Sequence, residues 1–134
     1  MNSPIKVLLA KPTQACHDRG VRYLARRLTD AGFGVIFSNF LLADELVSTA
    51  LQEDVDVVGV SSSSGGHMPV FEDLVQGLRA AGLSDVLVIG GGVIPAEDAA
   101  TLHEWGVGAV FGPGSSAEEA VDFIRTHARP RTPS

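Results

Sequence analysis

A histidine near the start of the chain, His17, carries the strongest indication of chemistry. It belongs to the segment His17-Asp18-Arg19-Gly20, which follows the first apolar run of the sequence. A neutral imidazole on a glycine-containing loop is suited to bind a metal or a cofactor. A single loop histidine is also commonly solvated or hydrogen-bonded, so the position alone leaves both interpretations open.

Other chemistries at this loop find less support in the sequence. Cys16 and His17 are adjacent, and adjacent residues rarely turn both side chains toward one substrate, which disfavours a Cys-His hydrolase. His67, His103 and His127 do not stand at metal-ligand spacing from His17. The chain also lacks a Gly-x-Gly-x-x-Gly segment after its first apolar run and a phosphate-loop lysine motif.

Three further segments have the small polar residues that ligand-binding loops use. The serines of residues 61–64 either form a turn or offer hydroxyl donors to a ring nitrogen or a phosphate. The glycines of 90–92 permit a tight turn or the close approach of a large flat ligand. Residues 112–116 precede a predicted helix, so Ser115 or Ser116 is a candidate N-cap, and the helix end is a candidate anion site.

Five short apolar runs must form the strands that carry these segments. They cover residues 5–10, 35–37, 55–60, 86–89 and 109–111, and a stretch with helical spacing of apolar residues follows each. The later helices are expected over 70–81, 96–105 and 117–127, and Gly32 is expected to end the first one. This strict alternation predicts an α/β fold with a five-stranded parallel sheet, helices on both faces, and right-handed crossovers.

The expected architecture is flavodoxin-like (Rossmann-like), with strand order 2-1-3-4-5. In such sheets ligands bind outside the carboxyl ends of the strands, at the switch point beside the first strand. The loops expected there are 11–20, 61–69, 90–95 and 112–116, which are all rich in Gly, Ser, Pro or His. A receiver domain of the phospho-relay type shares this fold but needs an aspartate at the end of the third strand, where this chain has Ser61.

Composition limits the classes of partner. With 134 residues, the chain is expected to form one domain over residues 1–128, followed by a flexible polar tail over 129–134. The net charge of -6 argues against nucleic acid and acidic membranes, and no apolar run approaches membrane-spanning length. Cys16 is the single cysteine and the N-terminus has no apolar signal segment, which predicts a cytoplasmic protein.

Several motifs occur together in a known order. They include His17-Asp18-Arg19-Gly20, Gly59-Val60-Ser61, Ser64-Gly65-Gly66-His67-Met68, Gly91-Gly92-Val93-Ile94-Pro95 and Val110-Phe111-Gly112-Pro113-Gly114. From about Ile5 to Ile124 the chain resembles the cobalamin-binding domain of adenosylcobalamin-dependent carbon-skeleton mutases, above all the methylmalonyl-CoA and isobutyryl-CoA type. A free-standing domain of this length is similar to the small subunit of a two-subunit mutase.

The resemblance implies a role for each loop. His17 would be the lower axial ligand of the cobalt, and the displaced nucleotide tail of the cofactor would enter a slot beside Ser61, Gly91 and Gly92. The cofactor-binding residues implied in this way are His17, Asp18, Arg19, Gly20, Ser61, Ser63, Gly91, Gly92, Gly112 and Gly114. Adenosylcobalamin would supply the radical chemistry of an acyl-CoA rearrangement, and a separate large catalytic barrel subunit would bind the substrate. This chain alone would be inactive.

Two residues depart from the family pattern. Ala15 stands where the family has the aspartate that orients the histidine, and loss of such a partner weakens a metal site by about 10- to 100-fold. Ser63 stands where the family has an apolar leucine. These departures leave open a non-catalytic scaffold or regulatory module with lost or altered cobalamin binding. A glutamate-mutase-type small subunit is a second alternative, while a methyl-transfer corrinoid carrier is disfavoured because it usually has a preceding helical domain.

Overall fold

The computed structural model describes residues 5–12, 19–40, 42–62, 67–92, 94–111 and 116–128, in which strands and helices alternate. The strands are β1 (Lys6–Pro12), β2 (Gly34–Phe40), β3 (Val57–Ser62), β4 (Leu87–Gly92) and β5 (Ala109–Phe111). The helices are α1 (Arg19–Asp30), α2 (Ala43–Glu53), α3 (His67–Ala80), α4 (Ala96–Trp105) and α5 (Ala117–His127). The predicted tail over 129–134 lies outside the described residues.

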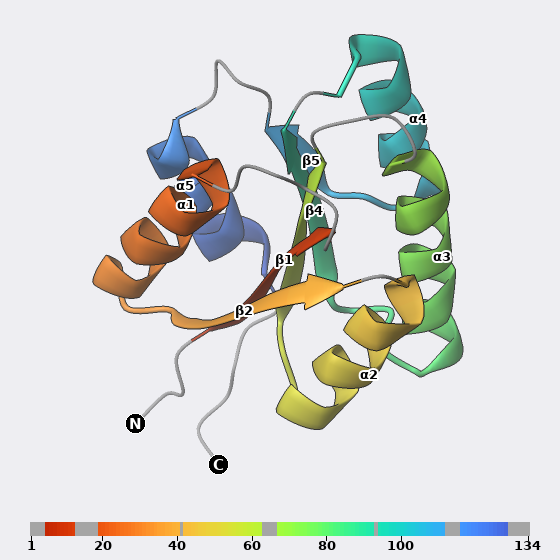
Figure 1. Ribbon diagram of the computed structural model, residues 1–134, viewed down its shortest axis with the longest axis horizontal. Helices are drawn as coiled ribbons and strands as arrows, with labels where there is room; N and C mark the ends of the chain where they lie inside the picture. The colour runs from red at the N-terminus through yellow and green to blue at the C-terminus, as the bar shows by residue number, and fades with distance from the viewer. Residues whose placement is uncertain are drawn as a thin grey trace.

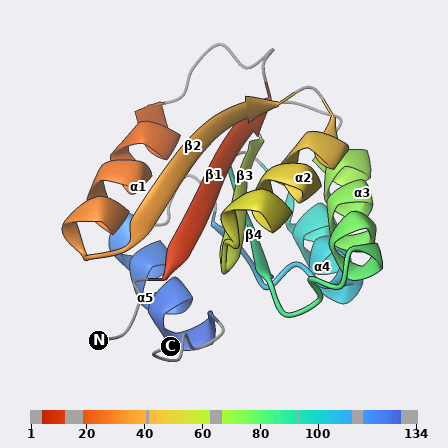
Figure 2. The same cartoon turned by 90° about the horizontal axis from the view of Figure 1, so that it is seen from below.

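The strands form one parallel sheet in the order β2-β1-β3-β4-β5, which confirms the predicted architecture. Helices α1 and α5 cover one face of the sheet, and α2, α3 and α4 cover the other (Figures 1 and 2). Each face has its own apolar core: Leu28 and Ile124 are buried under α1 and α5, and Phe71 and Leu74 are buried on the α3 side. Within the described residues, no helix has the length and apolar character needed to cross a membrane.

The strands reach further toward their carboxyl ends than the apolar runs predicted. β1 to β4 each extend two or three residues past the predicted limit, and the pairs Ser61–Gly91 and Ser62–Gly92 continue the ladder between β3 and β4. Apolar runs mark buried side chains, whereas backbone pairing continues through serine and glycine. The sequence analysis had placed Ser61, Gly91 and Gly92 in loops. The structure shows that they lie at the ends of strands.

Two helices begin earlier than expected. α3 starts at His67 instead of residue 70, because Pro69 falls in its first turn, where a missing N–H is tolerated. Arg19 and Gly20, expected in a loop, form the first residues of α1. The bounds of α4 and α5 agree with the prediction, and Gly32 adopts a φ of 97° just after α1, as expected of a helix-ending glycine.

Candidate functional site

A cavity of about 440 Å³ lies between the carboxyl half of the sheet and the helices α1 and α5. Its volume falls within the range of about 300 to 1,000 Å³ that is usual for ligand pockets. The lining is mostly apolar and comes from β1, β3, β4, β5 and the two helices: Leu9, Ala10, Val21, Tyr23, Leu24, Gly59, Val60, Ser61, Ile89, Gly90, Gly91, Gly92, Phe111, Ser116, Ala117, Glu118 and Ala120. It occupies the sheet edge that the sequence predicted for ligand binding.

The neighbouring strands β3 and β4 form part of the floor of the cavity. Gly59 of β3 pairs with Ile89 of β4, and Ser61 pairs with Gly91. These residues lie on the strand face that α1 and α5 cover, because side chains two residues apart share a face. A Cβ on Gly59 would lie 3.0 Å from Leu9 Cδ2 and 3.2 Å from Ile89 Cγ1, so the floor is already closely packed there.

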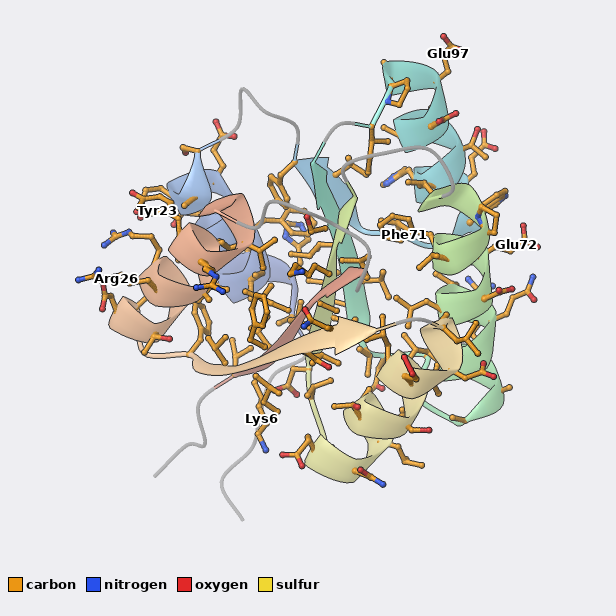
Figure 3. All side chains as sticks on the ribbon, viewed as in Figure 1. Lys6, Tyr23, Arg26, Phe71, Glu72 and Glu97 are labelled. Atoms are coloured by element: carbon orange, nitrogen blue, oxygen red, sulfur yellow. The ribbon has the colours of Figure 1, made fainter. Side chains whose placement is uncertain are left out.

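The triple glycine of β4 serves three separate purposes. A Cβ on Gly91 would meet only the Phe111 carbonyl oxygen, at 3.5 Å, so a larger side chain there would enter the cavity. A Cβ on Gly90 would lie 2.7 Å from Phe71 Cζ, which packs against the strand from α3 on the opposite face (Figure 3). Gly92 has a φ of 104°, which favours glycine where the chain leaves the strand. Only Gly91 thus opens the cavity by lacking a side chain.

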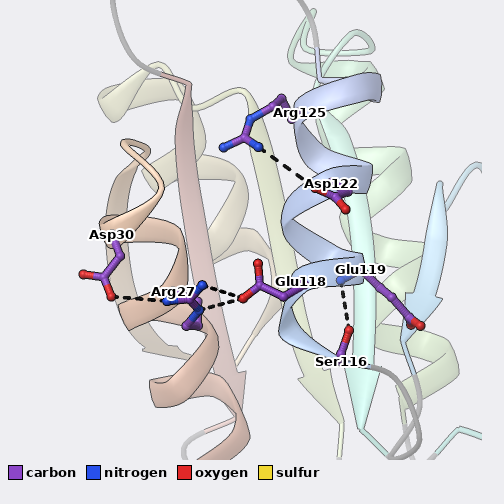
Figure 4. A network of polar contacts seen from close by, with 7 residues as sticks. All are labelled: Arg27, Asp30, Ser116, Glu118, Glu119, Asp122 and Arg125. Carbon is purple, nitrogen blue, oxygen red and sulfur yellow. Dashed lines mark hydrogen bonds and ion pairs between the residues drawn. The ribbon is translucent and has the colours of Figure 1, made fainter.

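The first turn of α5 forms part of the opposite wall. Ser116 is the N-cap of α5, and its hydroxyl accepts a hydrogen bond from the Glu119 N–H at 3.2 Å (Figure 4). The cap interpretation is therefore confirmed for Ser116, which also lines the cavity, while Ser115 lies outside the described residues. Because its hydroxyl already satisfies one free N–H of the helix end, Ser116 fixes the direction in which α5 leaves the site.

An ion pair joins the two helices at the side of the cavity. Arg27 of α1 donates from Nε at 2.7 Å and lies within 2.6 Å through Nη2 of the same Glu118 oxygen, Oε1, on α5 (Figure 4). Arg27 Nη1 also lies 3.7 Å from the Asp30 carboxylate. The hydrogen bond and the charge of Glu118 raise the pKa of Arg27 above its ordinary value. The arginine therefore stays charged at every pH in common use.

The structure brings together three of the predicted cofactor residues, Ser61, Gly91 and Gly92, around this cavity. Arg19 and Gly20 open α1, which supplies another wall. His17, Asp18, Ser63, Gly112 and Gly114 lie outside the described residues, as does Ala15. In the part of the chain that the structure describes, no three His, Cys, Asp or Glu side chains are grouped as metal ligands.

The sequence analysis missed several residues that line the cavity. Gly59 gave a usable signal, because a glycine inside the β-branched run 55–60 indicates close approach to the strand. Tyr23, Leu24 and Glu118 gave none, because their position depends on how two helices distant in sequence pack. The arrangement as a whole is a slot with mostly apolar walls that is open above Gly91, suited to a flat, largely apolar group.

Comparisons with known proteins identify the family of this chain. Residues 5–122 match the family described as the B12 binding domain. The chain is 46% identical over 125 residues to the 2-hydroxyisobutanoyl-CoA mutase small subunit of Aquincola tertiaricarbonis, covering 92% of each chain. It is 39% identical over 127 residues to methylmalonyl-CoA mutase of Escherichia coli strain K12, covering 91% of this chain and 18% of that enzyme.

A solved structure shows the same fold. A novel cobalamin-binding protein from Desulfitobacterium hafniense DCB-2 superposes with a TM-score of 0.76 at 22% identity, covering 91% of this chain and 58% of that one. The family match extends over most of the chain, and a relative of similar length shares nearly half of its residues. The chain therefore belongs to the B12-binding domain family.

Proposed function

We propose that this chain is the cobalamin-binding small subunit of a two-subunit acyl-CoA mutase. The observation that carries the proposal is the cavity of about 440 Å³ beside Ser61 and Gly91, whose mostly apolar lining fits the flat base of a nucleotide tail. The similarity to a mutase small subunit of nearly the same length supports a large catalytic barrel subunit as the partner. When bound, adenosylcobalamin would supply the radical chemistry of a 1,2-rearrangement.

The residues of this chain would bind and orient the cofactor. Ser61, Gly91 and the α5 turn at Ser116 would enclose the tail, while His17 would be the lower axial ligand of the cobalt. In the sequence His17 comes two residues before α1, which forms a wall of the cavity, and this supports its assignment. Asp18, Ser63, Gly112 and Gly114 would complete the cofactor site at the same sheet edge.

Visible absorption tests the proposal directly. Titration of the purified protein with adenosylcobalamin or hydroxocobalamin is expected to give saturable binding and a spectral change that His17→Ala removes. Electron paramagnetic resonance of the cob(II)alamin state gives a second measurement. The hyperfine splitting from the axial nitrogen should change from a triplet to a doublet when the protein is labelled with ¹⁵N. An unchanged splitting would show that a ligand from outside the protein holds the cobalt.

The departure at residue 15 provides a second test of the same assignment. If the missing carboxylate limits the site, Ala15→Asp is expected to tighten cobalamin binding by about 10- to 100-fold. Unchanged affinity would reject that explanation. No binding by the wild-type protein, even with a mutase large subunit present, would favour the non-catalytic scaffold or regulatory module.

A further inference from the structure

We infer that the Arg27–Glu118 ion pair holds α1 and α5 at the separation that the nucleotide tail of the cofactor requires. Both are positioning residues in this inference, which rests on the proposed function. The pair joins the third turn of α1 to the first turn of α5, across the helices that wall the cavity (Figure 4).

Apolar packing between these helices is fullest away from the cavity. Leu28 of α1 and Val121 and Ile124 of α5 are buried together in the core on this face. Nearer the carboxyl edge, Leu24 packs against this core but also lines the cavity, as Ala117 does. Apolar packing beside the cavity is therefore one-sided, and a further contact can define the separation of the two helices there.

The geometry of the ion pair can supply this contact. Two nitrogens on one edge of the Arg27 guanidinium, Nε and Nη2, approach a single oxygen of Glu118 at 2.7 and 2.6 Å. Both contacts are charge-assisted, and such contacts are shorter and stronger than hydrogen bonds between neutral groups. Glu118 itself lines the cavity, and Tyr23 and Leu24, one helical turn before Arg27, line it too. A shift of either helix would change the width of the cavity.

The exposure of the pair separates this role from a role in folding. The side chains of Arg27 and Glu118 are 38% and 58% exposed, and pairs this exposed contribute little to folding stability. Loss of the pair should therefore leave the fold intact but weaken the binding of the nucleotide tail. Because Arg27 stays charged at ordinary pH, ionic strength is the variable to change: the screening length falls from about 10 Å at 0.1 M salt to about 3 Å at 1 M.

A double-mutant cycle on the full chain tests the inference, using Arg27→Met, Glu118→Gln and the combination of the two. Each protein is titrated with cobalamin and with cobinamide, the corrin that lacks the nucleotide tail. We expect either single change to weaken cobalamin binding by about twofold to fivefold, the range set by exposed ion pairs, with cobinamide binding unchanged. The double variant should bind cobalamin no more weakly than the single variants.

Asp122→Asn is the matched control. The substitution removes the same charge from the same helix as Glu118→Gln does. Asp122, however, is 78% exposed and pairs within α5 with Arg125, at 4.0 Å (Figure 4). The substitution should leave both affinities unchanged. The preference for cobalamin over cobinamide should fall with salt in the wild type and in this control, which keep the Arg27–Glu118 pair, but not in the variants that lack it.

Three results would overturn the inference while leaving the proposed function in place. They are unchanged cobalamin affinity in the variants, an equal loss for cobinamide, and additive effects of Arg27→Met and Glu118→Gln, which would mean that the two residues act separately. A wild-type protein that binds no cobalamin would overturn both.

Discussion

At the scale of single residues, the cavity depends on one position where a side chain is absent. Gly91 faces the space between α1 and α5 and pairs with Ser61 on the neighbouring strand. A Cβ at residue 91 would have only the Phe111 carbonyl oxygen nearby, so the fold can accommodate a side chain there. The same side chain would take up space in the cavity. This separation makes Gly91 a suitable position for testing the site without disturbing the sheet.

Gly91→Val is expected to weaken cobalamin binding about tenfold or more, which corresponds to about 1.4 kcal/mol. The added side chain would occupy the space proposed for the nucleotide tail, so cobinamide binding should change little. Spectroscopic titration measures both affinities. Gly34→Val, at the amino end of β2, is the control, because a Cβ there is 3.7 Å from Lys6 Cγ and away from the cavity. Equal effects of the two variants would contradict this role for Gly91.

Gly90→Ala is expected to destabilise the protein by about 1 to 3 kcal/mol, the usual effect of overpacking a core. Its Cβ would lie 2.7 Å from Phe71 Cζ. Phe71→Leu should relieve the clash, so the double variant should lose less stability than the sum of the single variants. Urea denaturation gives the three free energies of unfolding. Additive losses would show that Phe71 does not limit residue 90.

Part of this site could be identified from the sequence, because residues of a type suited to ligand binding fell at the expected carboxyl edge of the sheet. Ser61, Gly91 and Gly92 were grouped from their types and from the expected sheet edge, and the structure places all three around one cavity. Tyr23 and Glu118 could not be found in the same way, because an exposed aromatic or acidic residue on a helix has no signature of what faces it. Their position follows from the packing of α1 against α5.

At the scale of elements, helix bounds followed from the sequence better than strand bounds. α4 and α5 were predicted to the residue, since apolar spacing and end signals agree in both. β5 was predicted to the residue, but β1 to β4 were predicted too short at the carboxyl edge. In β3 and β4 this is because Ser62 and Gly92 continue the backbone ladder without adding apolar side chains. The predicted strand ends are therefore wrong at the edge of the sheet where the cavity lies, because the strands end there in small residues such as serine and glycine.

Ser116→Ala is expected to destabilise the protein by about 1 kcal/mol, because the change removes the hydroxyl that accepts from the Glu119 N–H. Ser116→Asp should retain most of the stability, since a carboxylate also caps a helix and suits its N-terminus. Thermal or urea unfolding measures both variants. Ser48→Ala, at an exposed position inside α2, is the control and should cause no loss. A stable Ser116→Ala variant would contradict the capping role.

At the scale of the whole molecule, the two faces of the sheet are covered unequally. Three helices, α2, α3 and α4, close one face, while two helices, α1 and α5, cover the other (Figure 2). The cavity lies on the face with two helices. The general prediction of a site at the carboxyl edge followed from strand order, but the choice of face required the positions of α1 and α5.

Cobalamin is expected to stabilise the folded protein in proportion to its occupancy. At a free concentration about 100 times the Kd, the stabilisation is about 2.7 kcal/mol, which raises the Tm of a domain of this size by about 8 °C. Differential scanning fluorimetry or calorimetry over a concentration series measures the shift. Cobinamide at equal concentration should give a smaller shift, because it leaves the space under α1 and α5 empty. A Tm that does not vary with cobalamin concentration would contradict the proposal.

The contact of Gly90 with Phe71 has a consequence for changing the ligand. Behind Gly90 the space is filled by Phe71, and Gly59 and Gly91 have no side chain to remove. Substitutions at Gly59 and Gly91 can therefore make the cavity shallower but not deeper. Room for a larger group must come from lining residues that have a side chain to shorten, such as Ile89 of β4 or Leu24 of α1. In this domain, adaptation to bulkier ligands would therefore change those side chains and leave Gly59 and Gly91 as they are.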